Sequence, residues 1–232
     1  MTIFSISSKI SPFFRRRRVK KFLSTFQPTR ETRILDVGGY PLCWRDIPIQ
    51  SHITLLNTHP LCSYDRSFMT ANQEFVQGDG TDLHYEDKSF DIVFSNSVIE
   101  HLGTFEKQQA FAREAQRVGR GYWVQTPARE CLIEPHYLTP FIHWLSKPVQ
   151  KRLLRNYTIW GWLQRPSEQT LDSVLAELRL IDRNEFNGMF PQASIWLERM
   201  IGLPKSYTAY KVPPATETTA SLKKSGALVS NQ

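Results

Sequence analysis

Residues 33–41 read Arg-Ile-Leu-Asp-Val-Gly-Gly-Tyr-Pro, residues 78–80 read Gly-Asp-Gly, and residues 90–101 read Phe-Asp-Ile-Val-Phe-Ser-Asn-Ser-Val-Ile-Glu-His. In the first and third stretches a short apolar run gives way to small or polar residues. This pattern is typical of a buried parallel strand that ends in a loop over the sheet edge. Because ligands of open α/β sheets bind at the carboxyl ends of the strands, the three stretches predict a site for a nucleotide-type cofactor.

The length and composition of the chain fit one domain with embellishments. The chain has 232 residues, of which 41% are hydrophobic, enough for one sizeable core. No uncharged apolar run reaches the roughly 18 residues that a membrane-spanning helix needs. Cys43, Cys62 and Cys131 show neither CxxC nor metal-ligand spacing, and their odd number argues against a disulfide framework. We therefore expect a cytoplasmic protein without a metal site.

The positive charge of the chain is concentrated in a basic N-terminal arm, residues 1–29. The net charge is +7, yet the first 30 residues contain eight basic and no acidic residues, and the remainder has 21 basic against 22 acidic residues. The body is therefore not a basic nucleic-acid-binding surface. Apolar residues follow the arginines of the arm at helical spacing: Val19, Phe22, Leu23 and Phe26.

Two interpretations of this arm stay open. It can be a helix that packs on the domain with its arginine face in water. It can also be an amphipathic helix on an anionic membrane surface, which would make the protein peripheral on the inner face of a membrane. A transit peptide is a minor third option, because no clean cleavage pattern follows the basic residues.

Strand and helix patterns alternate along the body, which predicts a doubly wound α/β sheet. The first five strands are expected at residues 33–37, 53–56, 75–77, 92–95 and 122–125. A helix is predicted from Thr104, which can cap its start, to Val118, with Gly119 closing its end.

The C-terminal third predicts two more helices and two more strands. The first helix has one apolar stripe formed by Leu171, Val174, Leu175 and Leu178. We then expect a strand near residues 180–186, a helix that begins at Pro191 and ends before Gly202, and a last strand at residues 206–212. Residues 213–232 have the composition of a disordered tail.

The order of the three opening motifs resembles the class I S-adenosylmethionine-dependent methyltransferases, especially the small-molecule, type 11-like branch with Phe-Asp and Glu-His in its fourth motif. The resemblance covers residues 30–212. It implies a Rossmann-like, seven-stranded sheet that is mostly parallel. It also implies a closing hairpin that inserts an antiparallel C-terminal strand. The cofactor that it implies is S-adenosyl-L-methionine.

The resemblance assigns cofactor contacts first to the turn after strand 33–37. Gly38 and Gly39 stand where the backbone must approach a ligand closely or adopt a positive φ. Asp36 would orient the amino-acid end of the cofactor, or simply hold the loop. The family pattern has more glycine than this chain, in which Tyr40 and Pro41 follow, so the path of the loop departs from that pattern.

The ends of the next three strands supply the other predicted cofactor contacts. Asn57 stands where many relatives have an acid that binds the ribose hydroxyls; its amide can donate and accept but brings no charge. Asp79 would accept from the adenine amino group and Gly80 would contribute its backbone, although Asp beside glycine is also ordinary turn chemistry. Ser95 and Asn96 would line the cofactor channel.

Two histidines are candidate catalytic bases. His101 follows Glu100 in the fourth motif and can either take a proton near neutral pH or fix the loop by hydrogen bonding. His136 belongs to a Glu-Pro-His stretch at residues 134–136 that resembles a recurrent lid feature. A base is needed only if the acceptor must lose a proton, because a sulfonium methyl group is already activated.

Residues 127–166 are too long for an ordinary connection and are crowded with aromatic residues and prolines. The resemblance implies a helical, aromatic lid over the acceptor pocket. Packing is an equal alternative for Trp160 and Trp162. Lysines and arginines among apolar residues here could also meet a bilayer or an anionic acceptor.

The sequence thus predicts an S-adenosylmethionine-dependent methyltransferase that acts on a small-molecule or lipid- or glycan-linked acceptor, at oxygen rather than carbon or nitrogen. The alternative is a non-catalytic Rossmann-like partner or scaffold protein with a degenerate cofactor loop. Tyr40, Pro41 and Asn57 favour that alternative, whereas Asp79 and the Glu-His pair oppose it. A nicotinamide dehydrogenase fits less well, because its glycine pattern is missing.

Overall fold

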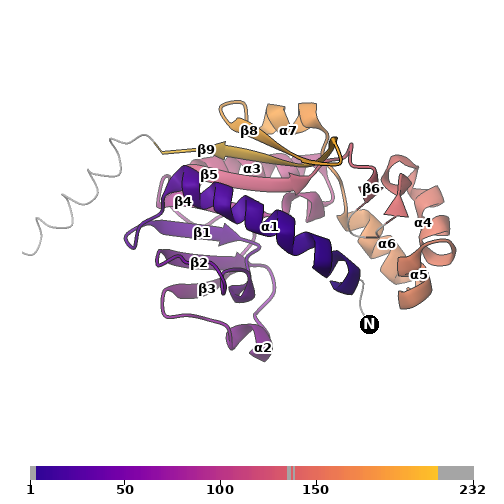
Figure 1. The fold of residues 1–232 in the computed structure, drawn as a ribbon, viewed down its shortest axis with the longest axis horizontal. Helices are drawn as coiled ribbons and strands as arrows, with labels where there is room; N and C mark the ends of the chain where they lie inside the picture. The colour runs from indigo at the N-terminus through magenta and orange to yellow at the C-terminus, as the bar shows by residue number, and fades with distance from the viewer. Residues whose placement is uncertain (1–3, 135–136, 138, 214–232) are drawn as a thin grey trace, which may run out of the picture.

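A seven-stranded sheet forms the centre of the computed structural model, which describes residues 4–134, 137 and 139–213 (Figure 1). The strand order is β3-β2-β1-β4-β5-β9-β8. Strands β1 to β5 run parallel, β9 runs antiparallel to β5, and β8 runs antiparallel to β9. This arrangement confirms the predicted Rossmann-like sheet with an inserted antiparallel C-terminal strand. The strands are β1 (Arg33–Val37), β2 (His52–Asn57), β3 (Gln73–Gln77), β4 (Phe90–Asn96), β5 (Gly119–Pro127), β8 (Ser194–Met200) and β9 (Leu203–Lys211).

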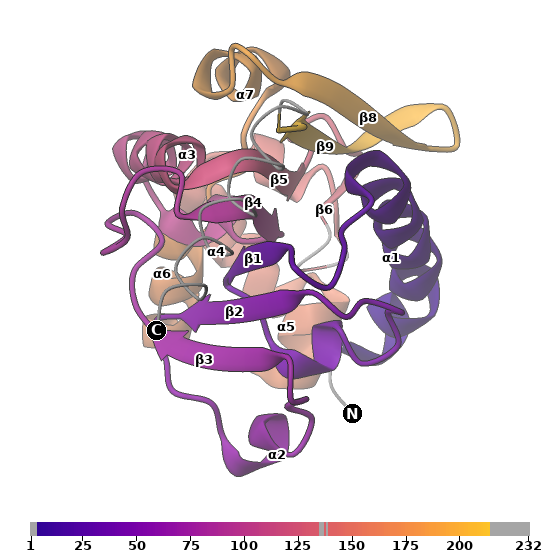
Figure 2. The ribbon, with the colours of Figure 1, turned by 90° about the vertical axis from the view of Figure 1, so that its left-hand side faces the viewer.

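Different helices cover the two faces of the sheet (Figure 2). On one face, α1 (Phe4–Phe26) inserts Phe22 among Ile34 and Trp123 of the strands. On the other face, α3 (Phe105–Val118) and α7 (Arg183–Met189) form the larger core with the strands. As predicted, the Thr104 hydroxyl caps α3 by accepting from the backbone N–H of Lys107.

The crossovers between the first strands are short. Only a 3-10 turn, Pro41–Cys43, lies between β1 and β2, and only the one-turn helix α2 (Ser63–Arg66) lies between β2 and β3. In a parallel sheet both faces must be covered, because the strands are apolar on both sides. Helix α1 therefore covers the face on which a helix between β1 and β2 would otherwise pack.

A buried ion pair fixes α1 to the C-terminal hairpin. Arg18 Nη1 donates to Glu198 Oε2 at 2.9 Å, and Glu198 is fully buried in the middle of β8. The same oxygen accepts from Ser206 Oγ at 3.0 Å and lies 3.3 Å from Lys205 Nζ. The arm therefore packs on the domain through its second half, as one of its two interpretations has it, but with Arg18 buried rather than in water.

The predicted strand near residues 180–186 is wrong, because α7 occupies most of it. Asp182 accepts hydrogen bonds from the backbone N–H groups of Asn184 and Glu185, and the Glu185 side chain returns to the backbone of Asp182. This capping box satisfies the free donors of a helix start. Phe186, Met189 and Phe190 then repeat at helical spacing and are buried.

The predicted helix after Pro191 is also wrong, because the segment forms β8. Its apolar residues serve both faces of the sheet: Ile195 and Leu197 pack on the core beneath α3, and Trp196 packs on Trp123 beside α1. A short run that is apolar on both faces has no alternation by which to distinguish a strand from a helix.

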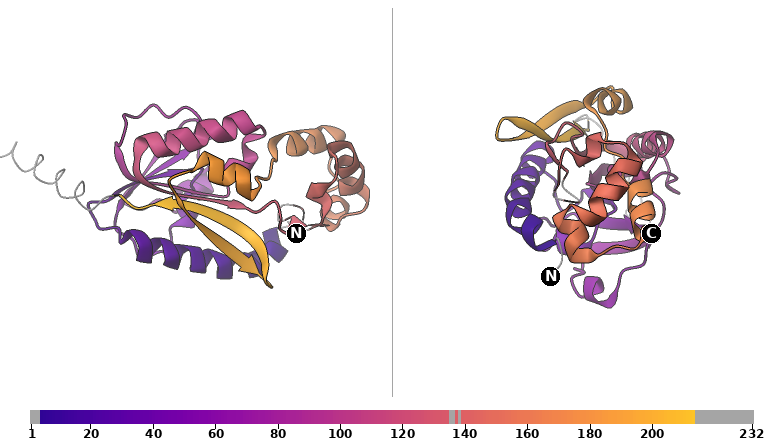
Figure 3. Two further views of the ribbon diagram at one scale, coloured as in Figure 1. Left: turned by 90° about the horizontal axis from the view of Figure 1, so that it is seen from above. Right: turned by 90° about the vertical axis from the view of Figure 1, so that its right-hand side faces the viewer.

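The insertion after β5 forms a helical layer beyond the end of the sheet toward which the β1 and β2 arrows point (Figures 1 and 3). It contains a small hairpin, β6 (Ile133–Glu134) and β7 (Thr139–Pro140), followed by α4 (Lys147–Asn156) and α5 (Ile159–Gln164). The predicted stripe helix, α6 (Glu168–Glu177), follows, with Leu171 and Leu175 buried against the insertion.

Two predictions can be compared with only part of the chain. The expected disordered tail lies outside the described residues, apart from Pro213. Among the helices that the structure describes, none has the length and apolar character needed to cross a membrane.

Candidate active site

The predicted cofactor residues lie at the carboxyl ends of four neighbouring strands. The strand order places the loops after β3, β2, β1 and β4 in one row. Adjacent strands in a sheet are about 4.8 Å apart, so the row is long enough for an extended ligand. Going along it, the residues are Asp79, Asn57, Gly38 and Asn96.

The carboxyl group of Asp36, at the end of β1, has a strongly raised pKa. Its side chain is buried, and its Oδ2 accepts a hydrogen bond from the indole Nε1 of Trp44 at 2.7 Å. Burial raises the pKa of Asp36 from its ordinary 3.8 to about 7, although the Trp44 hydrogen bond and the charge of Arg15 oppose the shift. Near neutral pH this carboxyl group therefore exists in both protonation states, and a cationic partner would favour the ionised one.

The two glycines of the first turn are both required by close contacts. Gly38 has φ of +79°, and a Cβ there would lie 2.4 Å from Val98 Cγ2. A Cβ on Gly39 would lie 2.0 Å from Asp36 Oδ2. The turn thus folds directly over the Asp36 carboxyl group, which leaves no room for any larger residue.

A cavity of about 280 Å³ adjoins this turn and is closed on one side by α1. Asp36, Arg15 and Arg18 line it, and the charge of Arg15 acts on the Asp36 carboxyl group. Arg15 also donates a hydrogen bond to the backbone carbonyl of Cys43, which joins α1 to the 3-10 turn after β1. The lining residues are Arg15, Arg18, Val19, Asp36, Gly38, Gly39, Cys43, Trp44, Ile47, Phe94, Asn96 and Ser97.

Sequence reasoning missed Arg15, Arg18 and Trp44 as residues of this edge. The two arginines belong to a run of four, and their charge pointed to a membrane surface rather than to a pocket. Trp44 lies in a loop without a motif.

At the other end of the row, Asp79 and Asn57 shape their own loops. Asp79 is exposed, and its Oδ1 accepts from both the backbone N–H and the hydroxyl of Thr81, each at 2.8 Å. Asn57 Oδ1 accepts from the Thr58 N–H at 2.9 Å. A Cβ on Gly80 would lie 2.6 Å from Val37 Cγ1, so Gly80 is needed for packing.

Ser95 and Asn96 differ in position. Ser95 is fully buried, and its hydroxyl donates to the Val37 carbonyl at 3.0 Å, which links β4 to β1. Asn96 lines the cavity beside Asp36, whereas Ser95 does not. Ser97, with φ of +58°, turns the chain away at this point and donates to Gln125.

Solved structures with the same fold are only distantly similar to this chain in sequence. The PH0226 protein from Pyrococcus horikoshii OT3 is 14% identical, with 86% of this chain and 91% of that chain covered and a TM-score of 0.54. A chain from the complex between the Haloferax volcanii Trm112 methyltransferase activator and a protein assigned as a methyltransferase is 12% identical, with 91% and 96% covered and a TM-score of 0.51. A protein assigned as an O-methyltransferase from Nostoc punctiforme PCC 73102 is 12% identical, with 90% and 60% covered and a TM-score of 0.50. These identities show the fold alone.

The family comparison is more specific. No curated protein matches the chain. The family model described as "Methyltransferase domain" matches residues 52–121, the segment that runs from β2 into β5 and includes Asn57, Asp79 and His101. The matched segment and the fold around it are those of a class I S-adenosylmethionine-dependent methyltransferase. The match to this model confirms the resemblance of the motifs to the type 11 branch, and S-adenosylmethionine is the cofactor.

The charged groups at this edge of the sheet fit S-adenosylmethionine. Its amino-acid end carries an ammonium and a carboxylate, and the cavity beside the first turn offers the Asp36 carboxyl group and the Arg15 guanidinium. Its adenosine would extend along the row toward Asn57 and Asp79. When bound, it supplies an activated methyl group, so the protein has to align the acceptor and exclude water.

The structure describes one of the two candidate bases, His101. His101 is exposed in the short turn Ile99–Leu102 that follows β4. The Glu100 side chain beside it is fully buried, and its Oε2 accepts from the hydroxyl of Thr126 on β5 at 3.0 Å. Glu100 thereby fixes the turn that presents His101. His136 lies outside the described residues.

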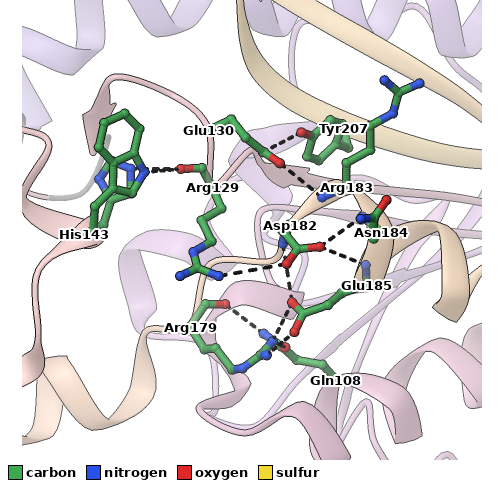
Figure 4. A network of polar contacts seen from close by, with 11 residues as sticks. Gln108, Arg129, Glu130, His143, Arg179, Asp182, Arg183, Asn184, Glu185 and Tyr207 are labelled. Carbon is green, nitrogen blue, oxygen red and sulfur yellow. Dashed lines mark hydrogen bonds and ion pairs between the residues drawn. The ribbon is translucent and has the colours of Figure 1, made fainter.

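A polar network joins the end of β5 to α7 beside the insertion (Figure 4). Arg179 donates to Glu185 and to Gln108 of α3, while the Arg129 guanidinium lies 3.9 Å from Asp182. His143 Nε2 donates to the Arg129 carbonyl at 2.9 Å. The network holds the insertion against the methyltransferase domain.

A larger cavity, of about 830 Å³, lies between the insertion and the turn after His101. Arg129, Lys147 and Arg179 give its lining a basic character. Lys147 Nζ donates to the Leu178 carbonyl at 2.8 Å, and burial lowers the pKa of Lys147. In the described part of the chain, no group of three or more His, Cys, Asp or Glu residues could hold a metal ion.

Proposed function

We propose that this methyltransferase holds S-adenosylmethionine across the ends of β4, β1, β2 and β3 and transfers its methyl group to an oxygen of a small, lipid- or glycan-linked acceptor. The observation that carries the proposal is the single cavity that combines Asp36, Arg15 and the Gly38–Gly39 turn. A carboxyl group and a guanidinium in one small cavity complement the two charges of an α-amino acid.

The methionine end of the cofactor would occupy this cavity. Asp36 would accept from the ammonium, and Arg15 would donate to the carboxylate. Asn96 lines the same cavity from the end of β4, where the reacting methyl group would lie. Ser95 would help to position Asn96 without touching the cofactor, because its hydroxyl links β4 to β1.

The adenosine would extend over the ends of β2 and β3. Asn57 would bind the ribose hydroxyls through its amide, which both donates and accepts. The exposed Asp79 would accept from the adenine amino group, and the Gly80 backbone would contact the ring. The fold of the Asp79 loop supports this role, because Thr81 holds one carboxylate oxygen in place.

An Asp79→Ala variant is expected to bind S-adenosylmethionine and S-adenosylhomocysteine at least about tenfold more weakly than the wild type. Loss of one hydrogen bond to a charged acceptor corresponds to about 1.5–3 kcal/mol, which is tenfold or more in affinity. Calorimetric titration of the purified protein measures both ligands.

The matched control is Asp82→Ala, which removes an exposed carboxylate three residues further along the same loop. It should bind like the wild type. Equal weakening by both substitutions would assign the effect to the charge or fold of the loop rather than to Asp79. Saturable binding by the wild type supports the enzyme, and no binding by a folded wild type would contradict the proposed function.

The acceptor would enter the larger cavity beneath the insertion. Its lining has four basic residues, Arg129, Lys147, Lys151 and Arg179, against the acidic Asp172, and this excess suits an acceptor that carries negative charge, such as a phosphate-linked lipid or glycan. The cavity includes Gly103, two residues beyond His101. The structurally similar Nostoc protein is assigned as an O-methyltransferase, which is compatible with an oxygen acceptor.

A His101→Ala variant is expected to slow turnover about 100-fold while its affinity for S-adenosylhomocysteine stays at the wild-type value. General base catalysis contributes about 10²–10⁴-fold when the acceptor loses its proton in the transition state. The measurement is single-turnover methyl transfer to an acceptor found by screening, beside calorimetry. His84→Ala, which removes another exposed histidine, is the control. Unchanged turnover would leave His136 as the candidate base.

A second candidate function is a non-catalytic partner protein. The glycine-poor turn with Tyr40 and Pro41 and the uncharged Asn57 favour it. One fold neighbour comes from a complex with a methyltransferase activator, which is compatible with a protein partner for this chain as well. The calorimetric titration distinguishes the two functions. A partner protein with a degenerate cofactor site would fold but bind neither S-adenosylmethionine nor S-adenosylhomocysteine.

A peripheral position at an anionic membrane surface also belongs to this proposal. Arg16 and Arg17 are exposed on α1, and Phe13 beside them is 66% exposed. A basic helix face with an exposed aromatic ring is suited to an anionic lipid surface.

A further inference from the structure

The outer face of α5 exposes four large apolar side chains in a row. Ile159, Trp162 and Leu163 lie at helical spacing on one face, and Tyr157 precedes them. Their exposed fractions are 59% for Ile159, 76% for Trp162, 52% for Leu163 and 75% for Tyr157. We call these four residues the α5 surface. A contiguous apolar surface of this kind marks an interaction site more often than a solvated face.

This surface is held rigidly, because the opposite side of α5 is tightly packed. The Thr158 hydroxyl caps the helix by accepting from Gly161 N–H and donates to the Leu154 carbonyl of α4. A Cβ on Gly161 would lie 1.8 Å from that carbonyl oxygen, so the helices touch through their backbones. Trp160 packs at a tilted angle against the buried Tyr137 ring, with centroids 5.4 Å apart. The α5 surface is therefore the side that the fold leaves uncovered.

Basic residues flank the α5 surface in the sequence. Residues 147–165 contain five basic and no acidic residues. Lys151 and Arg155 form ion pairs with acids of α6, which reduces their contribution. Arg152 and Arg165 are exposed and lie before and after the apolar row in the sequence. The charge next to the row is therefore positive.

We propose that the α5 surface docks on an anionic lipid bilayer. Tyrosine and tryptophan rings with polar tips favour the boundary between headgroups and acyl chains, and isoleucine and leucine insert below them. Lysine and arginine near a bilayer are attracted by anionic lipids. The exposed charges of Arg152 and Arg165 complement anionic lipid headgroups, so the bilayer is the occupant that the chemistry favours.

Docking through α5 gives the proposed acceptor cavity a defined neighbour. Helix α4, which precedes α5, also lines that cavity, through Lys147, Gln150 and Lys151. A lipid-linked acceptor could then pass from the bilayer to the cavity without crossing water. This consequence rests on the proposed function, whereas the docking itself does not.

The test compares wild type with an Ile159→Ser, Trp162→Ser double variant in vesicle co-sedimentation. The vesicles contain either phosphatidylcholine alone or equal parts of phosphatidylcholine and phosphatidylglycerol. We expect the wild type to bind the mixed vesicles and the double variant to bind them at least about tenfold more weakly. Arg152→Gln should also weaken binding, and added salt should weaken it further.

Tyr64→Ser is the matched control, because Tyr64 is a 64% exposed aromatic residue in α2, outside the insertion. It should bind vesicles like the wild type. Calorimetry with S-adenosylhomocysteine shows whether each variant keeps the folded site, so a failure of the cofactor proposal is seen separately from a failure of docking.

Three outcomes would overturn the docking proposal. The first is equal vesicle binding by wild type and double variant. The second is loss of binding on Arg16→Gln, Arg17→Gln substitution of α1 while the double variant binds normally. The third is absence of vesicle binding by a wild type whose self-association, measured by light scattering, is abolished by the double variant.

Discussion

A Gly39→Ala variant is expected to lose measurable S-adenosylmethionine binding and to unfold at a lower temperature than the wild type. The added methyl carbon would lie 2.0 Å from Oδ2 and 2.3 Å from Cγ of Asp36. The Asp36 carboxyl group cannot move away from the added methyl carbon, because it is buried and accepts a hydrogen bond from the Trp44 indole. Forcing an extra methyl group into such a contact costs about 1–3 kcal/mol and displaces the turn that closes the cavity.

The measurements are thermal unfolding and calorimetric titration with S-adenosylmethionine. Gly188→Ala is the matched control, because nothing lies within 4 Å of a Cβ at this position in α7. Alanine there should leave the unfolding temperature equal or raise it, since alanine favours a helix by up to about 1 kcal/mol over glycine. If Gly39→Ala bound the cofactor as tightly as the wild type, the turn over Asp36 would not be part of the site.

An Asp36→Asn variant is expected to be more stable than the wild type above neutral pH and weaker in cofactor binding. Burial raises the pKa of Asp36 to about 7, so the folded state disfavours the ionised carboxylate. The stability that the neutral group contributes is fully present below its ordinary pKa of 3.8 and is lost as the pH rises through about 7. That gap corresponds to about 4 kcal/mol. Asparagine cannot ionise and should flatten the dependence.

Denaturant titrations between about pH 5 and pH 8 measure this difference in unfolding free energy. Asp46→Asn, at an exposed residue paired only with its neighbour Arg45, is the control and should change little. A wild type without pH dependence in this range, or an equal dependence in Asp36→Asn, would contradict the assignment to Asp36.

Ligand binding should show the opposite dependence on pH. If the ionised Asp36 accepts from the ammonium of the cofactor, S-adenosylhomocysteine binds the wild type more tightly as the pH rises toward and through about 7. The ligand then lowers the pKa of Asp36 and recovers part of the lost stability. In Asp36→Asn the affinity should be weak at every pH.

The parallel part of the fold could be predicted from the sequence because its short apolar runs give way to small or polar turn residues at the sheet edge. Residues 33–37 contain the apolar Ile34, Leu35 and Val37 before the Gly38–Gly39 turn, and the structure forms β1 over this range. β8 could not be predicted in this way. Its central Glu198 is fully buried only because Arg18 reaches it from a helix 180 residues earlier, and no local pattern reports such a pair.

Some residues of the candidate site could be predicted from the sequence and others could not, for the same reason. Residues at the strand ends could be placed from motifs, because parallel strands end at one edge. Arg15 and Trp44 could not, since their positions depend on α1 covering the space left by a missing crossover helix. That replacement is a property of tertiary packing rather than of any one segment.

The buried ion pair between Arg18 of α1 and Glu198 of the C-terminal hairpin also affects how the protein folds. Arg18 meets its carboxylate partner only after the ribosome has made β8, and Ser206 completes the contact a few residues later. Until then, the α1 wall of the proposed cofactor cavity is held only by contacts such as that of Arg15 with the Cys43 carbonyl and lacks its buried ion pair. Contacts between such distant segments form slowly. Nascent chains should therefore acquire cofactor binding only when nearly all of the domain has left the ribosome.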